Sequence, residues 1–279
     1  MKLATYKDGS RDGQLVVVSS DLSTAHHASA IASRMQQVLD DWAFLAPQLH
    51  DLSRTLDEGR ARHAFPFEPR MCMAPLPRAC RAVEAQIETE AASAEPSWQA
   101  LPGDGLLGAC DEVTLAGAPP ALAVAPRWIA LTGELPLGSS PDQALDGVRL
   151  VGAGLQWVQP GEVSGGRPWL SLAPVVMTPE AVLAGDRLAL ALAPTGLEPG
   201  VDPSAEAALS APLGPLLARL ACGRGVRAGT LVTLGPPAQP LGAAARVALV
   251  PRAVRGQAPL GGIDVGVRRV VAGAASSAR

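Results

Sequence analysis

The chain has 279 residues, of which 48% are hydrophobic and only 3% aromatic, and its formal net charge at pH 7 is −3. This hydrophobic content excludes a disordered chain, and the 29 Gly and 26 Pro follow no period, which excludes a collagen-like one. The slightly acidic balance provides no basic surface for a nucleic-acid backbone, so no nucleic-acid partner is expected.

The N-terminal part of the sequence predicts a small module of two strands and two helices. Two apolar runs, 3–6 and 15–18, flank Asp-Gly turn signals and are typical of a β-hairpin. Apolar residues then recur at helical spacing over residues 25–43, and Pro47 is expected to end that helix. A second, shorter helix is expected over residues 49–56.

The pattern then changes to a Pro-rich connector over residues 65–77 and to many short elements. Residues 81–95 are rich in Ala and Glu and are expected to form a short helix. One later helix is expected at 213–221. Short strands are expected at 128–132, 148–151, 174–177, 187–192, 230–234, 245–250 and 265–270.

These elements together predict an α+β fold that is mainly β. We expect a small α/β domain at residues 1–78, a larger strand-rich domain at 79–272 and a tail at 273–279. The larger domain would be built from many strands with one late helix.

The cysteine usage and the apolar runs bear on the compartment. The four cysteines form no CxxC pair and are too sparse for a secreted scaffold, so free, buried thiols are expected. No apolar signal segment follows Met1, and no apolar run is long enough to span a bilayer. We therefore expect a cytoplasmic protein without membrane contact.

Several segments together resemble bacterial members of the fumarylacetoacetate hydrolase family. The resemblance is dense in the first 80 residues and continues as islands in family order. The segments that carry it are 1–13, 36–42, 61–67, 73–79, 132–138, 144–151, 227–232 and 262–264. It implies a mixed β-roll catalytic-type domain with a cleft at its mouth, and commonly a homodimer.

The resemblance also implies a chemistry, the cleavage or decarboxylation of small β-diketo or 2-keto acids with Mg²⁺ or Mn²⁺. An acidic triad holds the cation in the family, and two of its carboxylates come from a Glu-x-Glu on a strand. Residues i and i+2 of a strand face the same side, so both carboxylates reach one cation. The cation then polarises the substrate's keto-enolate oxygens.

At the matched positions this chain carries other residues. The Glu-x-Glu positions hold Ala125 and Arg127, and the Asp position holds Gln156. The family's Lys is matched by Arg167, and the Thr of its Gly-x-Gly-Thr turn by Pro236. A methyl group and a guanidinium supply no anionic oxygen, so the sequence predicts a degenerate metal site.

The family's catalytic His also has no counterpart, because no His follows His63. Glu84 is a weak catalytic candidate, as the remaining member of the family's His/Glu pair. A lone Glu is more typical of a solvated helix residue, however. We therefore expect no cofactor and assign no metal ligand.

Two hypotheses follow for the function. The first is a homologue that has lost metal-dependent catalysis, a pseudoenzyme. The alternative is an active hydrolase or decarboxylase that cleaves a C–C bond in acylpyruvates or β-diketo acids with Mg²⁺ or Mn²⁺ at a rebuilt site. The carboxylates considered for that site are Glu112, Glu134, Glu162 and Asp186. A small keto acid is the expected ligand class in both, and a homodimer is implied by the resemblance.

Overall fold

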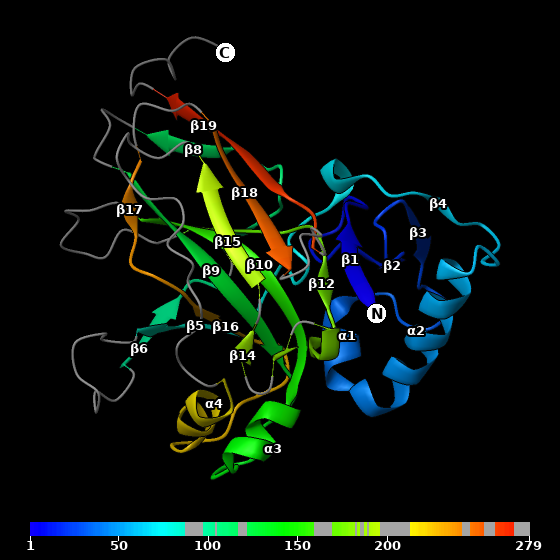
Figure 1. Ribbon diagram of the computed structural model, residues 1–279, viewed down its shortest axis with the longest axis horizontal. Helices are drawn as coiled ribbons and strands as arrows, with labels where there is room; N and C mark the ends of the chain where they lie inside the picture. Colours follow the sequence, from blue (N-terminus) through cyan, green and yellow to red (C-terminus); the bar gives the residue numbers. More distant parts are fainter. Residues whose placement is uncertain are drawn as a thin grey trace, which may run out of the picture.

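A computed structural model describes most of the chain, and four α-helices and two short 3₁₀ helices lie in the described part (Figure 1). The described residues are 1–86, 97–103, 105–116, 122–158, 169–181, 183–184, 187–188, 190–195, 213–241, 246–253 and 260–270. The helices are α1 (Met35–Asp40), α2 (Trp42–Asp57), α3 (Pro141–Asp146), α4 (Leu213–Ala221), η1 (Pro69–Met71) and η2 (Pro179–Ala181). Within these residues, no helix has the length and apolar character needed to cross a membrane.

Strands dominate the structure, and 13 of them form one sheet. Its members are β1 (Lys2–Tyr6), β2 (Gln14–Val18), β3 (Thr24–His27), β4 (Phe65–Pro66), β5 (Arg81–Gln86), β6 (Ser97–Leu101), β7 (Leu106–Leu107), β9 (Ala123–Thr132), β10 (Val148–Val158), β11 (Trp169–Leu172), β12 (Val176–Met177), β16 (Thr230–Leu234) and β17 (Gln239–Pro240). Its main path runs β4-β3-β2-β1-β12-β10-β9-β16-β5-β6. The N-terminal strands thus continue the sheet of the larger part, because β1 pairs with β12.

A smaller sheet of four strands and one hairpin complete the described strands. The sheet runs β15-β18-β19-β8, and the hairpin is β13-β14. Their bounds are β8 (Val113–Ala116), β13 (Leu183–Ala184), β14 (Arg187–Leu188), β15 (Leu190–Thr195), β18 (Arg246–Ala253) and β19 (Ile263–Val270). The observed architecture therefore confirms the expected mainly β, α+β fold.

The central pair of the main sheet is β9 and β10, two long antiparallel strands that are buried along nearly their whole length. Because successive side chains alternate between the two faces of the sheet, β9 contributes side chains to two hydrophobic cores. Ile129 and Leu131 pack with the N-terminal helices, whereas Trp128 and Ala130 pack with α4 on the opposite face. In Figure 1 the N-terminal helices and α4 accordingly lie on different sides of these strands.

The N-terminal hairpin is confirmed by the pairing of β1 with β2, but the helix expected over residues 25–43 is wrong. Its first residues form β3, which extends the hairpin by pairing with β2. The helical part begins only at Met35, and α2 continues through Pro47. Pro47 removes one backbone hydrogen bond. The helix persists because Leu45 and Leu49 are buried in the core on its inner face.

The helix expected at 81–95 is also wrong where the structure describes it, because Arg81–Gln86 is strand β5. β5 pairs with β16 on one side and β6 on the other, and Ala82 to Ala85 are buried. Burial between two strands outweighs the helical preference of Ala and Glu. Residues 87–96 lie outside the described part.

The later elements agree better with the expectations. The helix at 213–221 is confirmed as α4, and the strand at 230–234 as β16. The strand expected at 128–132 is confirmed but begins earlier, at Ala123. All four thiols are free, yet Cys80 and Cys222 are exposed, so the expectation of buried thiols is wrong for those two.

Candidate functional site

Three strands of the main sheet bring polar side chains together on one of its faces. Glu84 comes from β5, Arg127 from β9 and Gln156 from β10. Arg127 shares its face of β9 with Ile129 and Leu131, two positions apart each time, which is the face toward the N-terminal helices. The sheet therefore gathers one carboxyl group, one guanidinium and one amide at a single place, which we call the Glu84–Arg127–Gln156 cluster.

Each nitrogen of the Arg127 guanidinium donates a hydrogen bond to a protein oxygen. Nη2 donates to Oε1 of Glu84, and Nε donates to Oε1 of Gln156. Nη1 donates to the backbone carbonyl of Pro236 at 2.5 Å. Gln156 in turn donates from Nε2 to the second oxygen of Glu84, at 2.9 Å. The three side chains thus form a closed ring of hydrogen bonds with an ion pair inside it.

The cluster is almost completely removed from solvent. Glu84 is 6% exposed, Arg127 4% and Gln156 3%. Burial lowers the pKa of Arg127 below its ordinary value, and the charge of Glu84 opposes that shift. A guanidinium starts from so high a pKa that it stays protonated, so Arg127 is a buried cation neutralised by Glu84.

Most residues singled out in the sequence lie at this cluster. Ala125 is fully buried, shares the face of Arg127 and is in register with Gln156 across the β9–β10 pair. Pro236 supplies the carbonyl that Arg127 contacts. Arg167 lies outside the described residues. Glu84 is not the solvated helix residue that was expected, because it stands on a buried strand and pairs with Arg127.

Of the carboxylates considered for a rebuilt metal site, the two that the structure describes do not join this cluster. Glu112 and Glu134 are exposed, and Glu162 and Asp186 lie outside the described residues. Over the part of the chain that the structure describes, no group of three or more His, Cys, Asp and Glu side chains could hold a metal ion.

The donor set of the cluster does not fit the divalent cation that the resemblance implies. Mg²⁺ and Mn²⁺ prefer several oxygen ligands, with at least one or two carboxylates. Here a single carboxylate already binds a guanidinium, and the amide oxygen of Gln156 accepts from the same group. A second cation beside Arg127 would meet strong Coulomb repulsion in a site with little water.

Thr233 on β16 is a polar neighbour of the cluster that sequence analysis did not select as a site residue. It is in register with Glu84 on one side and Ile129 on the other. Its side chain is fully buried, and its hydroxyl has no hydrogen-bond partner. The period-two alternation of the strand expected at 230–234 places Thr233 and Leu231 on one face, and that is the signal that could have found it.

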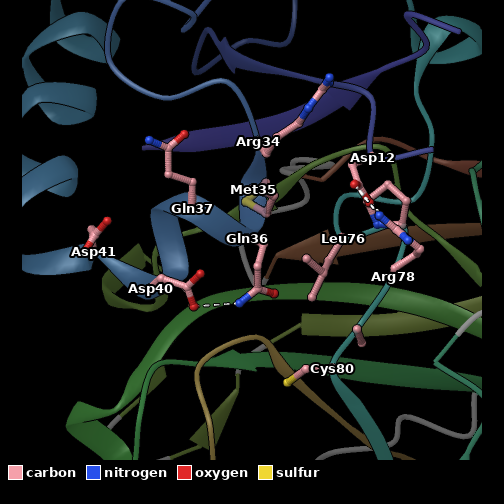
Figure 2. A pocket seen from close by; sticks show the side chains of 12 residues that line it. Asp12, Arg34, Met35, Gln36, Gln37, Asp40, Asp41, Leu76, Arg78 and Cys80 are labelled. Carbon is pink, nitrogen blue, oxygen red and sulfur yellow. Dashed lines mark hydrogen bonds and ion pairs between the residues drawn. The ribbon is translucent and has the colours of Figure 1, made fainter. Parts of the chain in front are cut away.

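A separate cavity of about 510 Å³ lies between α1 and the connector that leads into β5. Figure 2 shows two of its lining residues, Arg78 and Asp12, pointing toward each other, with Nε to Oδ1 at 2.8 Å and Nη2 to Oδ2 at 2.5 Å. Gln36 donates to Asp40 at 2.8 Å and to the carbonyl of Ala228 at 3.2 Å. The hydrogen bonds from Arg78 hold the pKa of Asp12 below its usual range. Both arginines of this cavity have carboxylate partners, since Arg34 binds Asp8.

Comparison with known proteins agrees with this architecture. Residues 1–78 match the family model described as fumarylacetoacetase N-terminal domain 2. No curated protein matches the chain.

Solved structures with the same fold cover nearly the whole chain. Maleylpyruvate hydrolase from Sphingobium sp. SYK-6 superposes with a TM-score of 0.72 at 15% identity, over 97% of this chain and 100% of that one. The same hydrolase in complex with manganese(II) and pyruvate gives 0.71 at 16% identity, over 96% and 99%. A probable 2-hydroxyhepta-2,4-diene-1,7-dioate isomerase from Mycobacterium abscessus gives 0.72 at 13% identity, over 97% and 99%.

Proposed function

We propose that this chain is a member of the fumarylacetoacetate hydrolase family and, within it, a pseudoenzyme; the match of residues 1–78 to the family's N-terminal domain model and the shared fold support the membership. In this proposal the Glu84–Arg127–Gln156 cluster takes the place of the metal centre. The observation that carries it is the position of Arg127, on the second Glu of the family's Glu-x-Glu by resemblance, with its guanidinium bound to Glu84 and Gln156.

The proposal accounts for charge as well as for geometry. A metal centre would supply a cation that an incoming keto acid can reach and bind. Arg127 supplies a cation too, but all of its nitrogens already donate to protein oxygens and its side chain is buried. The protein therefore already holds this cation in place through all three of its nitrogens, and the buried guanidinium is poorly accessible to a substrate.

The competing function is an active, metal-dependent hydrolase or decarboxylase with a rebuilt site. The observation in its favour is the full-length likeness to a hydrolase that binds manganese(II) and pyruvate. The exposure of Glu112 and Glu134 weighs against it, because separated surface carboxylates are poor ligands for one cation. A small keto acid is the ligand class, and a homodimer the assembly, that we propose under either function.

The test is metal content measured together with turnover. The full chain is purified in the presence of Mn²⁺, freed of unbound metal by gel filtration and analysed by atomic emission. It is then assayed for cleavage of maleylpyruvate and of acetylpyruvate, and the Sphingobium maleylpyruvate hydrolase acting on maleylpyruvate is the positive control. We expect no stoichiometric manganese and no cleavage above the uncatalysed rate, and stoichiometric metal with chelator-sensitive cleavage would overturn the proposal.

A rebuilt variant sharpens the test. Ala125→Glu, Arg127→Glu and Gln156→Asp together restore the family's acidic triad and remove the internal cation. We expect this variant to bind Mn²⁺ in isothermal titration calorimetry, while the parent chain and a surface control, Arg54→Glu, do not. If the variant does not fold, as judged by circular dichroism, the measurement on the parent chain still decides.

A further inference from the structure

A second cavity, of about 330 Å³, opens at the first residues of β5 and does not involve the Glu84–Arg127–Gln156 cluster. β5 and β6 form one wall, and the turn that follows α4 forms another. The residues that matter for its chemistry are Arg81, Trp98 and Arg224, and apolar side chains supply much of the rest of the lining. Its volume falls within the range of small-molecule sites, roughly 300–1,000 Å³.

The strand register explains how the wall is built. Ala100 is in register with Val83 and Trp98 with Ala85 across the β5–β6 pair, so these four side chains share one face. Arg81 lies two positions before Val83 and belongs to the same face. Trp98 is partly buried against the core and presents its remaining surface to the cavity. The wall therefore combines a flat apolar surface with a cation at its edge.

The charges of this cavity are not balanced. Two arginines, Arg81 and Arg224, line the cavity, and no carboxylate is among the described residues that line it. Among the ion pairs of the described residues, none involves either arginine. Burial lowers the pKa of Arg81, and the charge of Arg224 lowers it further. An anion placed between the two guanidinium groups would relieve that repulsion.

We propose that this cavity binds a small organic carboxylate with a flat apolar body. The carboxylate accepts hydrogen bonds from Arg81 and Arg224, because a guanidinium presents paired N–H donors that match a carboxylate. The body of the ligand packs on Trp98 and the small apolar side chains beside it. The apolar wall favours this ligand over inorganic phosphate, which has only polar atoms to offer. This proposal holds whether or not the chain binds a catalytic metal ion.

The probe for this site is benzoate, a flat carboxylate of suitable size, and its neutral analogue benzamide is the matched ligand control. Binding to the full chain is measured by isothermal titration calorimetry at low salt, with inorganic phosphate as a third ligand. We expect benzoate to bind and both comparison ligands to bind at least about 10-fold more weakly, since hydrogen bonds to charged groups are the strong ones.

Four variants connect that binding to the two arginines. Arg81→Gln and Arg224→Gln are each expected to weaken benzoate binding by about 10-fold or more, and Arg81→Lys by less because it keeps the charge. The control is Arg227→Gln, which removes the same charge from an exposed residue of the same segment that does not line the cavity. Circular dichroism verifies that each variant is folded.

Three outcomes would overturn the proposal. Equal affinity for benzoate and benzamide would show that the arginines do not select the charge. An equal loss in Arg227→Gln would show diffuse attraction by surface charge and no site. Phosphate binding as tightly as benzoate would show an anion site in which the apolar wall has no part.

Discussion

Arg127 and Arg81 both stand on strands of the main sheet, yet their surroundings differ in kind. Arg127 is buried, pairs with Glu84 and donates at least one hydrogen bond from each of its three nitrogens to a protein oxygen. Arg81 lines an open cavity that it shares with a second cation, Arg224. The charge of Arg127 is neutralised by a carboxylate of the protein, which is typical of a structural ion pair. The charge of Arg81 lies near another positive charge, which is typical of a site that binds an anion.

β5 contributes side chains both to the Glu84–Arg127–Gln156 cluster and to the cavity lined by Arg81, from its two opposite faces. Glu84 and Arg81 are three positions apart on this strand, so their side chains leave opposite faces of the sheet. One strand thus contributes an anion to the Glu84–Arg127–Gln156 cluster and a cation to the cavity. Substitutions on its two faces are therefore expected to have effects of different size and sign.

The largest effect is expected for Arg127→Met, which removes the buried cation and keeps much of the side-chain volume. Glu84 then remains buried without its cationic partner, with only the hydrogen bond from Gln156 left, and such a change typically costs about 3–5 kcal/mol in the free energy of unfolding. Urea denaturation of the full chain measures the loss. The surface variant Arg54→Met is the control and is expected to change the free energy by less than about 1 kcal/mol, because its ion pair is exposed.

A double variant tests whether that loss comes from the ion pair. Adding Glu84→Gln to Arg127→Met removes the unpaired carboxylate and leaves an amide that can still bond to Gln156. We expect the double variant to recover more than half of the lost stability. A double variant as unstable as Arg127→Met would mean that packing, and not charge, explains the single variant.

A smaller loss is expected for Gly235→Ala, next to the cluster. A Cβ at this position would lie 2.3 Å from the backbone carbonyl oxygen of Pro126 and 3.2 Å from Nη1 of Arg127. Backbone must shift to admit it, and overpacking of this kind costs about 1–3 kcal/mol. Gly223→Ala is the matched control, because no atom lies within 4 Å of its added Cβ. Equal unfolding midpoints for the two variants would contradict the close approach.

The sequence indicated the positions of the Glu84–Arg127–Gln156 cluster, but it did not indicate their contacts. Counting from a resembling motif led to Ala125, Arg127, Gln156 and Pro236. The first three lie together because β9 and β10 pair in register, and Pro236 joins them because it follows β16, which also pairs with β9. The contact with Glu84 depends on β16, which joins β9 to β5 across a long separation in sequence. Local propensity predicts a helix over residues 81–95, whereas pairing with β16 and β6 makes Arg81–Gln86 a strand.

The cavity lined by Arg81 could not be predicted from the sequence either, because it is also formed by segments that are far apart in the sequence. Arg224 follows α4 in a turn, and nothing in its neighbourhood in sequence relates it to Arg81. A helix over 81–95 would also have placed Arg81 on a different face. Loop residues reach a site only through the packing of the elements that carry them, and that packing has no signature in one sequence.

The smallest effect, and the one that separates the two regions most clearly, is expected for Arg81→Gln without ligand. In the folded chain, burial and the nearby Arg224 lower the pKa of Arg81, so its charged form is less favourable folded than unfolded. Removing that charge removes a cost, and the free energy of unfolding should stay within about 0.5 kcal/mol of the parent or rise slightly. Thermal and urea denaturation measure this, with benzoate binding by the same sample as the second readout.

A loss comparable to that of Arg127→Met would show that Arg81 supports the fold as Arg127 does, and the contrast between the two arginines would fail. A stable variant that no longer binds benzoate would instead show a residue retained at no benefit to stability, as expected of a binding site.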